Sequence, residues 1–420
     1  MSELMIGEIP VSQLVAKYQT TLYVYDEKKL EDTIKAFKQG FQSDHFKTKI
    51  LYASKAFQTV EMLKLIEKYD LGLDVVSGGE IYTALRAEFP VEEIYFHGNN
   101  KTPDELRFAI ENGLNHFIVD NEMEVKLLDT LSQEYNKKIH VMIRLNVGIE
   151  AHTHEYIVTA HIDSKFGMLY ESEACQKALN IIQDSEQLLL EGFHAHIGSQ
   201  IFEMSAWLAE IDKLVSYLQD FDDVLSLNLG GGFGIRYTEN DAPLPIEKSV
   251  QELVSYTEEA LKKQGQTIQQ LMIEPGRSIV GEAGTTLYTV GFIKETPHKK
   301  YYFVDGGMTD NIRPALYQAE YTCDLATKLQ SEKSEKVTVA GKMCESGDVV
   351  IQETYLPVAE PGDILAVYAT GAYGYSMSSN YNRALTPAVV FVNDGVSKIV
   401  VRRQSYADLL RSEEIGRAHV

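Results

Sequence analysis

Eight short apolar runs, separated by amphipathic segments, constrain the fold of this 420-residue chain more than any other feature. The runs have the length of buried strands, and most intervening segments repeat their apolar residues with the period of a helix. Eight strands alternating with helices over about 250 residues predict a parallel (β/α)8 TIM barrel, with an open doubly wound sheet as the alternative. The expected strands are 50–53, 71–76, 94–97, 116–119, 139–145, 191–197, 224–229 and 270–273.

Helices are expected between these runs and once before them. Pro103, followed by two acidic residues, and Asn121, followed by Glu122, have the composition of helix starts. The expected helices are 27–41, 58–69, 79–88, 103–112, 122–135, 172–184, 205–219 and 247–263.

After Gly276 the helical rhythm stops, and short β-rich segments bounded by turns take over. Residues 393–395 (Asn-Asp-Gly) are a hairpin signal. We therefore predict a mostly β second domain, a Greek-key-like barrel or sandwich, which the strand at 21–26 joins. The expected division is 27–280 for a cofactor-binding barrel, and 1–26 plus 281–420 for a β domain that completes the active site.

Bulk composition narrows the function. The net charge of −22 and the pI near 4.9 argue against general binding to nucleic acid or to an anionic membrane. Three scattered cysteines form neither a disulfide framework nor a zinc pattern and suit a reducing compartment. Residues 1–20 lack the apolar core of a signal peptide, and no apolar run is long enough to span a bilayer. We expect a cytoplasmic protein.

Lys55 ends the first apolar run, within Tyr-Ala-Ser-Lys-Ala (52–56). A lysine at the carboxyl end of a buried strand is partly removed from water, and this disfavours the ammonium form. The neutral amine is the nucleophile that forms a Schiff base. The alternative is a lysine that only flanks a strand.

Two glycine loops follow the seventh and eighth runs, where barrels bind phosphate. Residues 230–234 (Gly-Gly-Gly-Phe-Gly) let backbone N–H groups approach an anion, although a flexible turn is the alternative. Residues 274–277 (Glu-Pro-Gly-Arg) form the second loop. Together with Lys55 they suggest pyridoxal 5'-phosphate. Glu274 would pair with the pyridine nitrogen, unless it forms an ion pair with Arg277.

Residues 194–200 (His-Ala-His-Ile-Gly-Ser-Gln) end the sixth run. With period two, His194 and His196 face the same way. His196 could stack on the cofactor ring, and Ser199 could donate to the phosphate. A paired-histidine metal site lacks a nearby third ligand, so no metal is expected.

Three motifs of the β region carry reactive or charged groups. Cys344 beside Glu345 could donate a proton, because a thiol titrates nearer neutrality than a hydroxyl; a buried, inert cysteine is the alternative. Arg313 is suited to a carboxylate. Residues 371–377 contain Tyr373, whose hydroxyl could reach a ligand.

Taken together, these motifs resemble the pyridoxal-phosphate-dependent decarboxylases of the alanine-racemase-like fold type, and within them the diaminopimelate decarboxylase family. The resemblance covers residues 21 to about 392. It rests on the motifs above together with Ile-Arg-Pro-Ala-Leu-Tyr (312–317), Cys-Glu-Ser-Gly-Asp (344–348) and Gly-Ala-Tyr-Gly-Tyr-Ser-Met-Ser-Ser-Asn-Tyr-Asn (371–382), in family order.

The resemblance implies a role for each matching residue. Lys55 would carry the cofactor as a Schiff base, and Cys344 would protonate the intermediate. The implied cofactor-binding residues are Lys55, Asp74, His196, Ser199, Gly230, Gly231, Gly232, Glu274, Pro275, Gly276, Arg277 and Tyr373. The implied substrate-binding residues are Arg277, Arg313, Tyr317, Glu345 and Tyr373.

The implied reaction is decarboxylation of meso-2,6-diaminopimelate to L-lysine and CO2, through an external aldimine and a quinonoid, as the last step of lysine biosynthesis. The resemblance also implies a homodimer in which Cys344 and Glu345 complete the partner's site. A decarboxylase for another basic amino acid or a carboxylated polyamine, a racemase, and an inactive binding or regulatory homologue are the alternatives. We further expect the loop 148–167 to help close the site, and residues 415–420 do not resemble a family terminus.

Overall fold

The structure, a computed structural model, describes residues 3–149, 163–223 and 225–414. The chain forms two compact units. The barrel unit comprises Asp32–Ile235 and Ala242–Ile279. The β unit comprises Met1–Glu31, Arg236–Asp241 and Val280–Val420.

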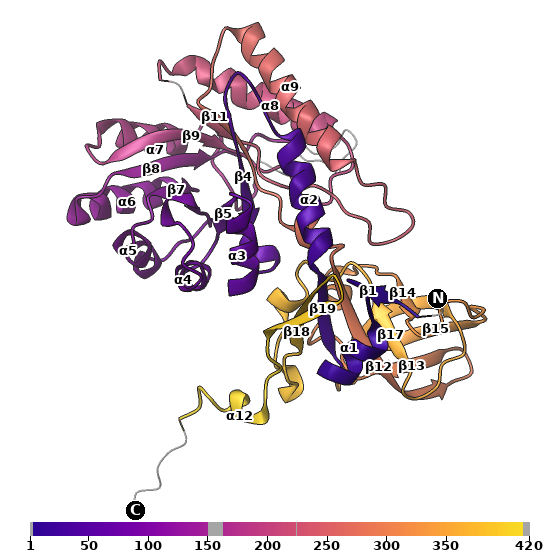
Figure 1. The fold of residues 1–420 in the computed structure, drawn as a ribbon. Helices are drawn as coiled ribbons and strands as arrows, with labels where there is room; N and C mark the ends of the chain where they lie inside the picture. The colour runs from indigo at the N-terminus through magenta and orange to yellow at the C-terminus, as the bar shows by residue number, and fades with distance from the viewer. Residues whose placement is uncertain (1–2, 150–162, 224, 415–420) are drawn as a thin grey trace, which may run out of the picture. The chain divides into compact units, whose positions relative to one another are not determined.

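The barrel unit contains, within the described residues, eight parallel strands that close into a barrel (Figure 1). Closure comes from the pairing of β11 with β4, where Ile273 lies beside Ile50. The open sheet is therefore excluded, and the predicted (β/α)8 barrel is confirmed. The strands are β4 (Lys47–Ala53), β5 (Gly72–Val75), β6 (Ile94–Phe96), β7 (His116–Val119), β8 (Ile139–Arg144), β9 (Leu188–His194), β10 (Ser226–Asn228) and β11 (Gln270–Ile273).

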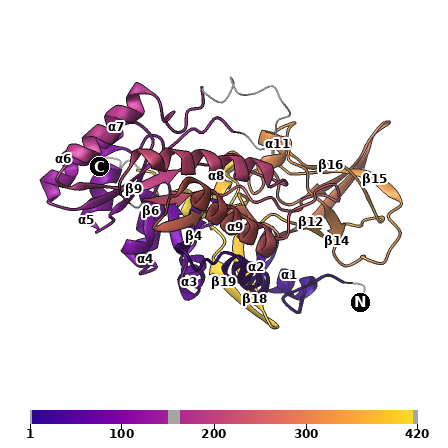
Figure 2. The ribbon, with the colours of Figure 1, turned by 90° about the horizontal axis from the view of Figure 1, so that it is seen from above.

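Helices follow most barrel strands, and side-chain caps begin several of them. The hydroxyl of Thr102 accepts from the N–H of Glu105 in a capping box, and the side chain of Asn121 caps the next helix, as predicted. In Figure 2, α8 and α9 run along the same side of the barrel. The helices are α2 (Glu27–Gly40), α3 (Val60–Lys68), α4 (Gly78–Arg86), α5 (Pro103–Glu111), α6 (Glu122–Tyr135), α7 (Glu173–Asp184), α8 (Ser205–Tyr217), α9 (Ile246–Gln264) and the short α10 (Arg277–Val280).

A fully apolar layer fills the middle of the barrel, apart from one tyrosine hydroxyl. Its members come from β4, β6, β7, β8 and β11 and are at most 1% exposed: Leu51, Tyr95, Ile118, Met142 and Met272. Chemistry therefore belongs to the loops at the carboxyl ends of the strands, where parallel barrels present their reactive groups.

The β unit is built on a sheet with the strand order β16-β15-β13-β12-β3-β18-β19. The long strand β12 also pairs with β17, which in turn pairs with β14. The strands are β1 (Met5–Ile6), β2 (Ile9–Pro10), β3 (Leu22–Asp26), β12 (Gly284–Glu295), β13 (Lys300–Val304), β14 (Cys323–Leu325), β15 (Glu335–Ala340), β16 (Val349–Leu356), β17 (Ile364–Val367), β18 (Ala388–Asn393) and β19 (Val396–Val401). The helices are α1 (Val11–Tyr18), α11 (Arg313–Tyr317) and α12 (Tyr406–Leu409).

Two predictions about this unit are confirmed. Strand β3, from the N-terminal region, pairs with β12 and β18 in the same sheet. The hairpin at 393–395 joins β18 to β19, with positive φ at Asp394 (45°) and Gly395 (75°). The sequence patterns did not predict α1, because only Val11 and Leu14 of that helix are buried.

Two predictions concern residues that the structure does not describe. Most of the predicted closing loop, 150–162, and the tail 415–420 lie outside the described residues. Within the described part of the chain, no helix is long and apolar enough to cross a membrane.

Candidate active site

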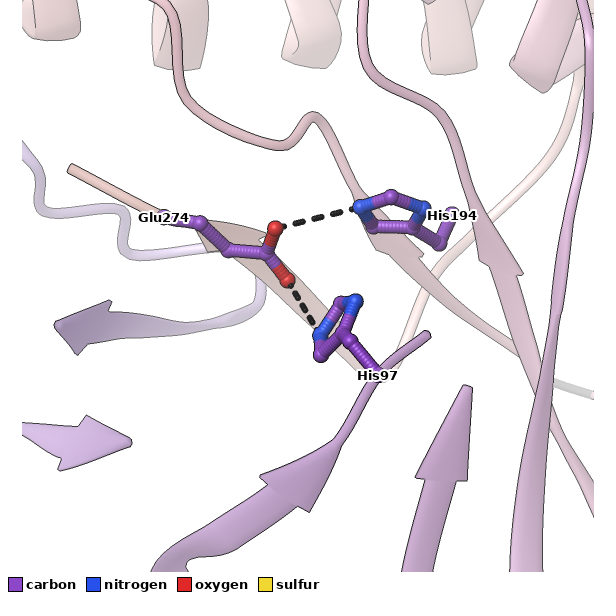
Figure 3. Close-up of side chains that lie close together, drawn as sticks. All are labelled: His97, His194 and Glu274. Carbon is purple, nitrogen blue, oxygen red and sulfur yellow. Dashed lines mark hydrogen bonds and ion pairs between the residues drawn. The ribbon is translucent and has the colours of Figure 1, made fainter. Parts of the chain in front are cut away.

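Glu274, which directly follows β11, is the centre of a buried polar cluster (Figure 3). Its Oε1 lies 2.9 Å from Nε2 of His97, and its Oε2 lies 3.1 Å from Nε2 of His194. The amide of Asn228 donates to Oε1 at 2.7 Å. These partners stand at the carboxyl ends of β6, β9 and β10, so closure of the barrel brings them together. The alternative considered from the sequence was an ion pair between Glu274 and Arg277. The partners of the Glu274 oxygens are instead His97, His194 and Asn228.

The electrostatics of this cluster keep Glu274 ionised. Burial alone would raise its pKa, but the charges of His97 and His194 and the hydrogen bond of His194 outweigh burial and hold the pKa well below the ordinary value. Burial lowers the pKa of His194 itself to about 4. A buried carboxylate held in this way can keep a proton on a ring nitrogen that approaches it.

The same three residues could also accept a metal ion. Among the described residues, His97, His194 and Glu274 place ligand atoms within 4.8 Å of one another. This group is not the paired-histidine site considered from the sequence: it contains His194 but not His196, and its other members, His97 and Glu274, come from different strands. Hydrogen bonds with His194 and Asn228 already engage the two Glu274 oxygens.

Lys55 lies in the turn Ser54–Ala56 that follows β4. Its Nζ is 3.5 Å from Oδ2 of Asp74, a carboxylate at the end of β5 that is almost fully buried. The side chain of Lys55 is 46% exposed. The side chain is therefore partly removed from water, as expected, and partly exposed.

His196 presents an exposed imidazole near Lys55. The N–H of Gly231 donates to its Nδ1 at 3.2 Å, which fixes the ring. Strand β9 ends at His194, so strand alternation no longer sets the direction of His196, and the two rings differ in environment. An exposed imidazole ring is suited to stacking on an aromatic ligand.

Two positions of the first glycine loop, 230–234, require glycine for different reasons. A Cβ on Gly231 would lie 2.3 Å from the carbonyl oxygen of Glu274. Gly232 has a φ of +103°, which favours glycine. The backbone N–H of Gly230 donates to the side-chain oxygen of Asn228. In the second glycine loop, Pro275 and Gly276 are buried.

Arg277 begins α10 and donates from Nη2 to the hydroxyl of Ser199 at 3.1 Å. This bond brings together the loops after β9 and β11. A guanidinium and a hydroxyl at the mouth of the barrel are ordinary partners of a phosphate or carboxylate group.

The remaining predicted residues belong to the β unit. Arg313 begins α11 and is only 8% exposed, whereas Tyr317, at the end of the same helix, is 60% exposed. Cys344 and Glu345 are exposed, and the N–H of Cys344 donates to the side chain of Asn382. The alternative of a buried, inert Cys344 is therefore excluded. Tyr373 is partly buried, with its ring centroid 6.0 Å from Cζ of Arg313.

The barrel residues fit pyridoxal phosphate. This cofactor has an aldehyde, a ring nitrogen that is useful when protonated, and a phosphate. The structure supplies an accessible amine at Lys55, a buried carboxylate at Glu274 and an open stacking face at His196. Glycine loops after β10 and β11 are suited to the phosphate.

The chain is similar in sequence to known proteins. A family model described as "Pyridoxal-dependent decarboxylase, pyridoxal binding domain" matches residues 27–281. The diaminopimelate decarboxylase of Bacillus subtilis is 48% identical over 412 residues, which cover 97% of this chain and 94% of that protein. The chain belongs to the diaminopimelate decarboxylase family. The family predicted from the motifs is thus confirmed, and with it the pyridoxal phosphate cofactor.

Solved structures of the family agree. The diaminopimelate decarboxylase of M. jannaschii, also determined with L-lysine, has a TM-score of 0.92 at 32% identity and covers 99% of this chain and 96% of its own. The Helicobacter pylori enzyme complexed with L-lysine has a TM-score of 0.84 at 30% identity, covering 96% and 98%. The fold of this chain is the fold of the family over its whole length.

The sequence patterns did not assign roles to four residues of this site. His97, His194 and Asn228 hold Glu274, and their position at strand ends was the available signal. Glu80 is the fourth: burial raises its pKa to about 7, while its carboxylate accepts from the N–H of Val76.

Proposed function

We propose that this protein decarboxylates meso-2,6-diaminopimelate to L-lysine and CO2, the last step of lysine biosynthesis. The carrying observation is the buried carboxylate of Glu274, held ionised by His97 and His194 in a barrel of the diaminopimelate decarboxylase family. The L-lysine complexes of two related enzymes support the identity of the product.

We propose that residues 27–280 bind the cofactor, with Tyr373 as an additional contact from the β unit. Lys55 would hold its aldehyde, Glu274 would hold a proton at its ring nitrogen, and His196 would stack on its ring. Asp74 would orient the amine of Lys55 from 3.5 Å. The residues proposed to bind the phosphate, or to form the loops around it, are Ser199, Gly230, Gly231, Gly232, Pro275, Gly276, Arg277 and Tyr373. When bound, pyridoxal phosphate supplies an electron sink for the electron pair that departing CO2 leaves behind.

We propose that residues 1–26 and 281–420 supply most of the substrate-binding groups. Diaminopimelate keeps one amino-acid end unreacted, and that end carries a carboxylate and an ammonium group. Arg277 and Arg313 are suited to the carboxylate, and Glu345 is suited to the ammonium. Tyr317 and Tyr373 would line the same substrate, and Sγ of Cys344 would give a proton to the carbon that has lost CO2.

A turnover assay tests the reaction. The protein, loaded with pyridoxal phosphate, should release lysine and CO2 from meso-diaminopimelate and should leave L-ornithine and L-arginine largely unchanged. Lys55→Ala should fold but lose activity, because the amine that holds the aldehyde is gone. Turnover of ornithine in place of diaminopimelate would refute the proposed substrate.

We also propose a homodimer, in which Cys344 and Glu345 act in the partner's site. Both residues are exposed, as groups that serve another copy must be. Mixing inactive Lys55→Ala with inactive Cys344→Ser should restore about a quarter of wild-type activity, since half of the random dimers are mixed and each has one intact site. No recovery after subunit exchange would contradict sharing. The three free cysteines, Cys175, Cys323 and Cys344, support our further proposal that the protein works in the cytoplasm.

A further inference from the structure

Arg313 is a buried cation without an acidic partner among the described residues. Its side chain is 8% exposed, and no carboxylate of the described chain lies within ion-pair distance. Removing a guanidinium from water is costly unless hydrogen bonds or an opposite charge compensate. The structure therefore has to stabilise this side chain by other means.

Tyrosines provide that stabilisation. Nη1 of Arg313 donates to the hydroxyl of Tyr237 at 2.9 Å and to the hydroxyl of Tyr321 at 2.6 Å. Its Cζ lies 5.0 Å from the ring centroid of Tyr237 and 5.8 Å from that of Tyr321, within cation–π range. The two rings also pack edge to face, with centroids 5.2 Å apart. Phenols hold the cation in place but leave its charge unneutralised.

The hydrogen bonds use only one corner of the guanidinium. Within the described residues, Nε and Nη2 of Arg313 have no protein acceptor, and neither atom is among the fully buried polar atoms. These two donors form the edge that binds a carboxylate in the bidentate manner. The guanidinium is thus oriented from one side and open to an anion on the other.

Local structure holds the two tyrosines. The backbone N–H groups of Tyr237 and Thr238 both donate to Oδ2 of Asp241, at 3.0 and 2.8 Å, which makes 236–241 a closed turn. The preceding Arg236 donates its N–H to Glu282 at 2.9 Å. Tyr321 lies two residues before β14.

We propose that Tyr237 and Tyr321 are positioning residues that make this protein selective for ligands with a carboxylate at the unreacted end. They would hold the guanidinium of Arg313 so that its open edge meets that carboxylate. The inference rests on the proposed function for the identity of the substrate. Neither tyrosine touches the substrate; each acts through Arg313.

The test compares two ligands that differ in one group. L-Lysine retains the carboxylate, and 1,5-diaminopentane has the same carbon chain and amines without it. Their dissociation constants are measured by equilibrium titration of the cofactor-loaded protein, in wild type, Tyr237→Phe and Tyr321→Phe. Phenylalanine keeps the ring and removes only the hydroxyl. Tyr355→Phe, at an exposed tyrosine of β16, is the matched control.

We expect each variant at Tyr237 or Tyr321 to weaken L-lysine binding about tenfold, since each loses one hydrogen bond to a charged group. Binding of 1,5-diaminopentane should stay within about twofold of wild type, and so should both ligands with the control. In turnover assays, KM for diaminopimelate should rise more than kcat falls, because the lost contact acts on binding.

A purely structural role gives a different result. Loss of folding or of cofactor would weaken both ligands equally, and that outcome, or unchanged L-lysine binding, would overturn the inference. Binding does not require turnover, so the two proposals fail separately. If the wild-type protein makes no lysine from diaminopimelate, the proposed reaction is refuted. If the ratio of the dissociation constants for L-lysine and 1,5-diaminopentane is unchanged in Tyr237→Phe and Tyr321→Phe, the proposed role of the tyrosines is refuted.

Discussion

Asn228→Asp is the sharpest test of how the protein controls the charge of Glu274. Asn228 donates from Nδ2 to Glu274 at 2.7 Å, and its Oδ1 accepts from the N–H of Gly230 at 3.0 Å. Aspartate has almost the same shape and keeps the second bond. It replaces the donor with an oxygen, so two buried carboxylates would lie in contact.

The magnitude follows from these contacts. Losing a hydrogen bond to a charged group costs about 1.5 to 3 kcal/mol unless a proton bridges the two oxygens. A bridging proton restores the bond, because two carboxylates in contact cannot both ionise, and it raises the pKa of the pair in the folded state above the unfolded value near 4. The folded variant then holds one proton more than the unfolded chain.

The sign of the pH dependence follows. A group whose pKa is raised on folding stabilises the protein at low pH and loses that contribution as the pH rises through the folded value. Relative to wild type, the variant should lose about 1.4 kcal/mol of unfolding free energy for each pH unit while the shared proton remains bound. Between pH 5 and pH 8 the difference should grow by up to about 4 kcal/mol.

The assay is urea unfolding of the cofactor-free protein, followed by circular dichroism at fixed protein concentration from pH 5 to pH 8. Asn180→Asp makes the same chemical change at an exposed position of α7 and should differ from wild type by less than about 0.5 kcal/mol at every pH. A difference for Asn228→Asp that is flat across the range, or that grows toward low pH, would refute the reasoning.

Two further predictions concern packing and buried charge. Gly231→Ala places a Cβ 2.3 Å from the carbonyl oxygen of Glu274, so urea unfolding should show a loss of about 1–3 kcal/mol together with weaker cofactor uptake. Gly79→Ala, where the nearest atom is 3.7 Å away within α4, should be neutral or stabilising. Lys101→Met leaves the buried carboxylate of Glu124 without its ammonium partner and should cost about 3–5 kcal/mol; adding Glu124→Leu should recover much of that loss in the same unfolding assay.

Much of the fold could be predicted because its signals are local. The alternation of apolar runs with amphipathic segments identified all eight barrel strands, and Pro103 and Asn121 marked helix starts. The hairpin at 393–395 was evident because two residues with positive φ have a narrow choice of amino acids. Short elements such as α1 and β14 were missed, since a few apolar residues establish no period.

Some residues of the candidate site could likewise be predicted from the sequence, and others could not. The motifs around Lys55 and Glu274 could be recognised in the sequence, because a reactive group and its loop are contiguous. The partners of Glu274 could not be recognised in this way. His97 and His194 are separated from Glu274 by 177 and 80 residues, and the chain contains many other polar residues that could have been its partners.

The sequence by itself determined the barrel, the β unit and the family, since periodicity, turn chemistry and contiguous motifs act over a few residues. Only the tertiary structure decided which side chains set the charge of Glu274 and which phenols surround Arg313. The physical reason is that hydrogen bonding and burial depend on distances in space. Closure of the barrel and folding of the 236–241 turn bring together residues that no local pattern connects.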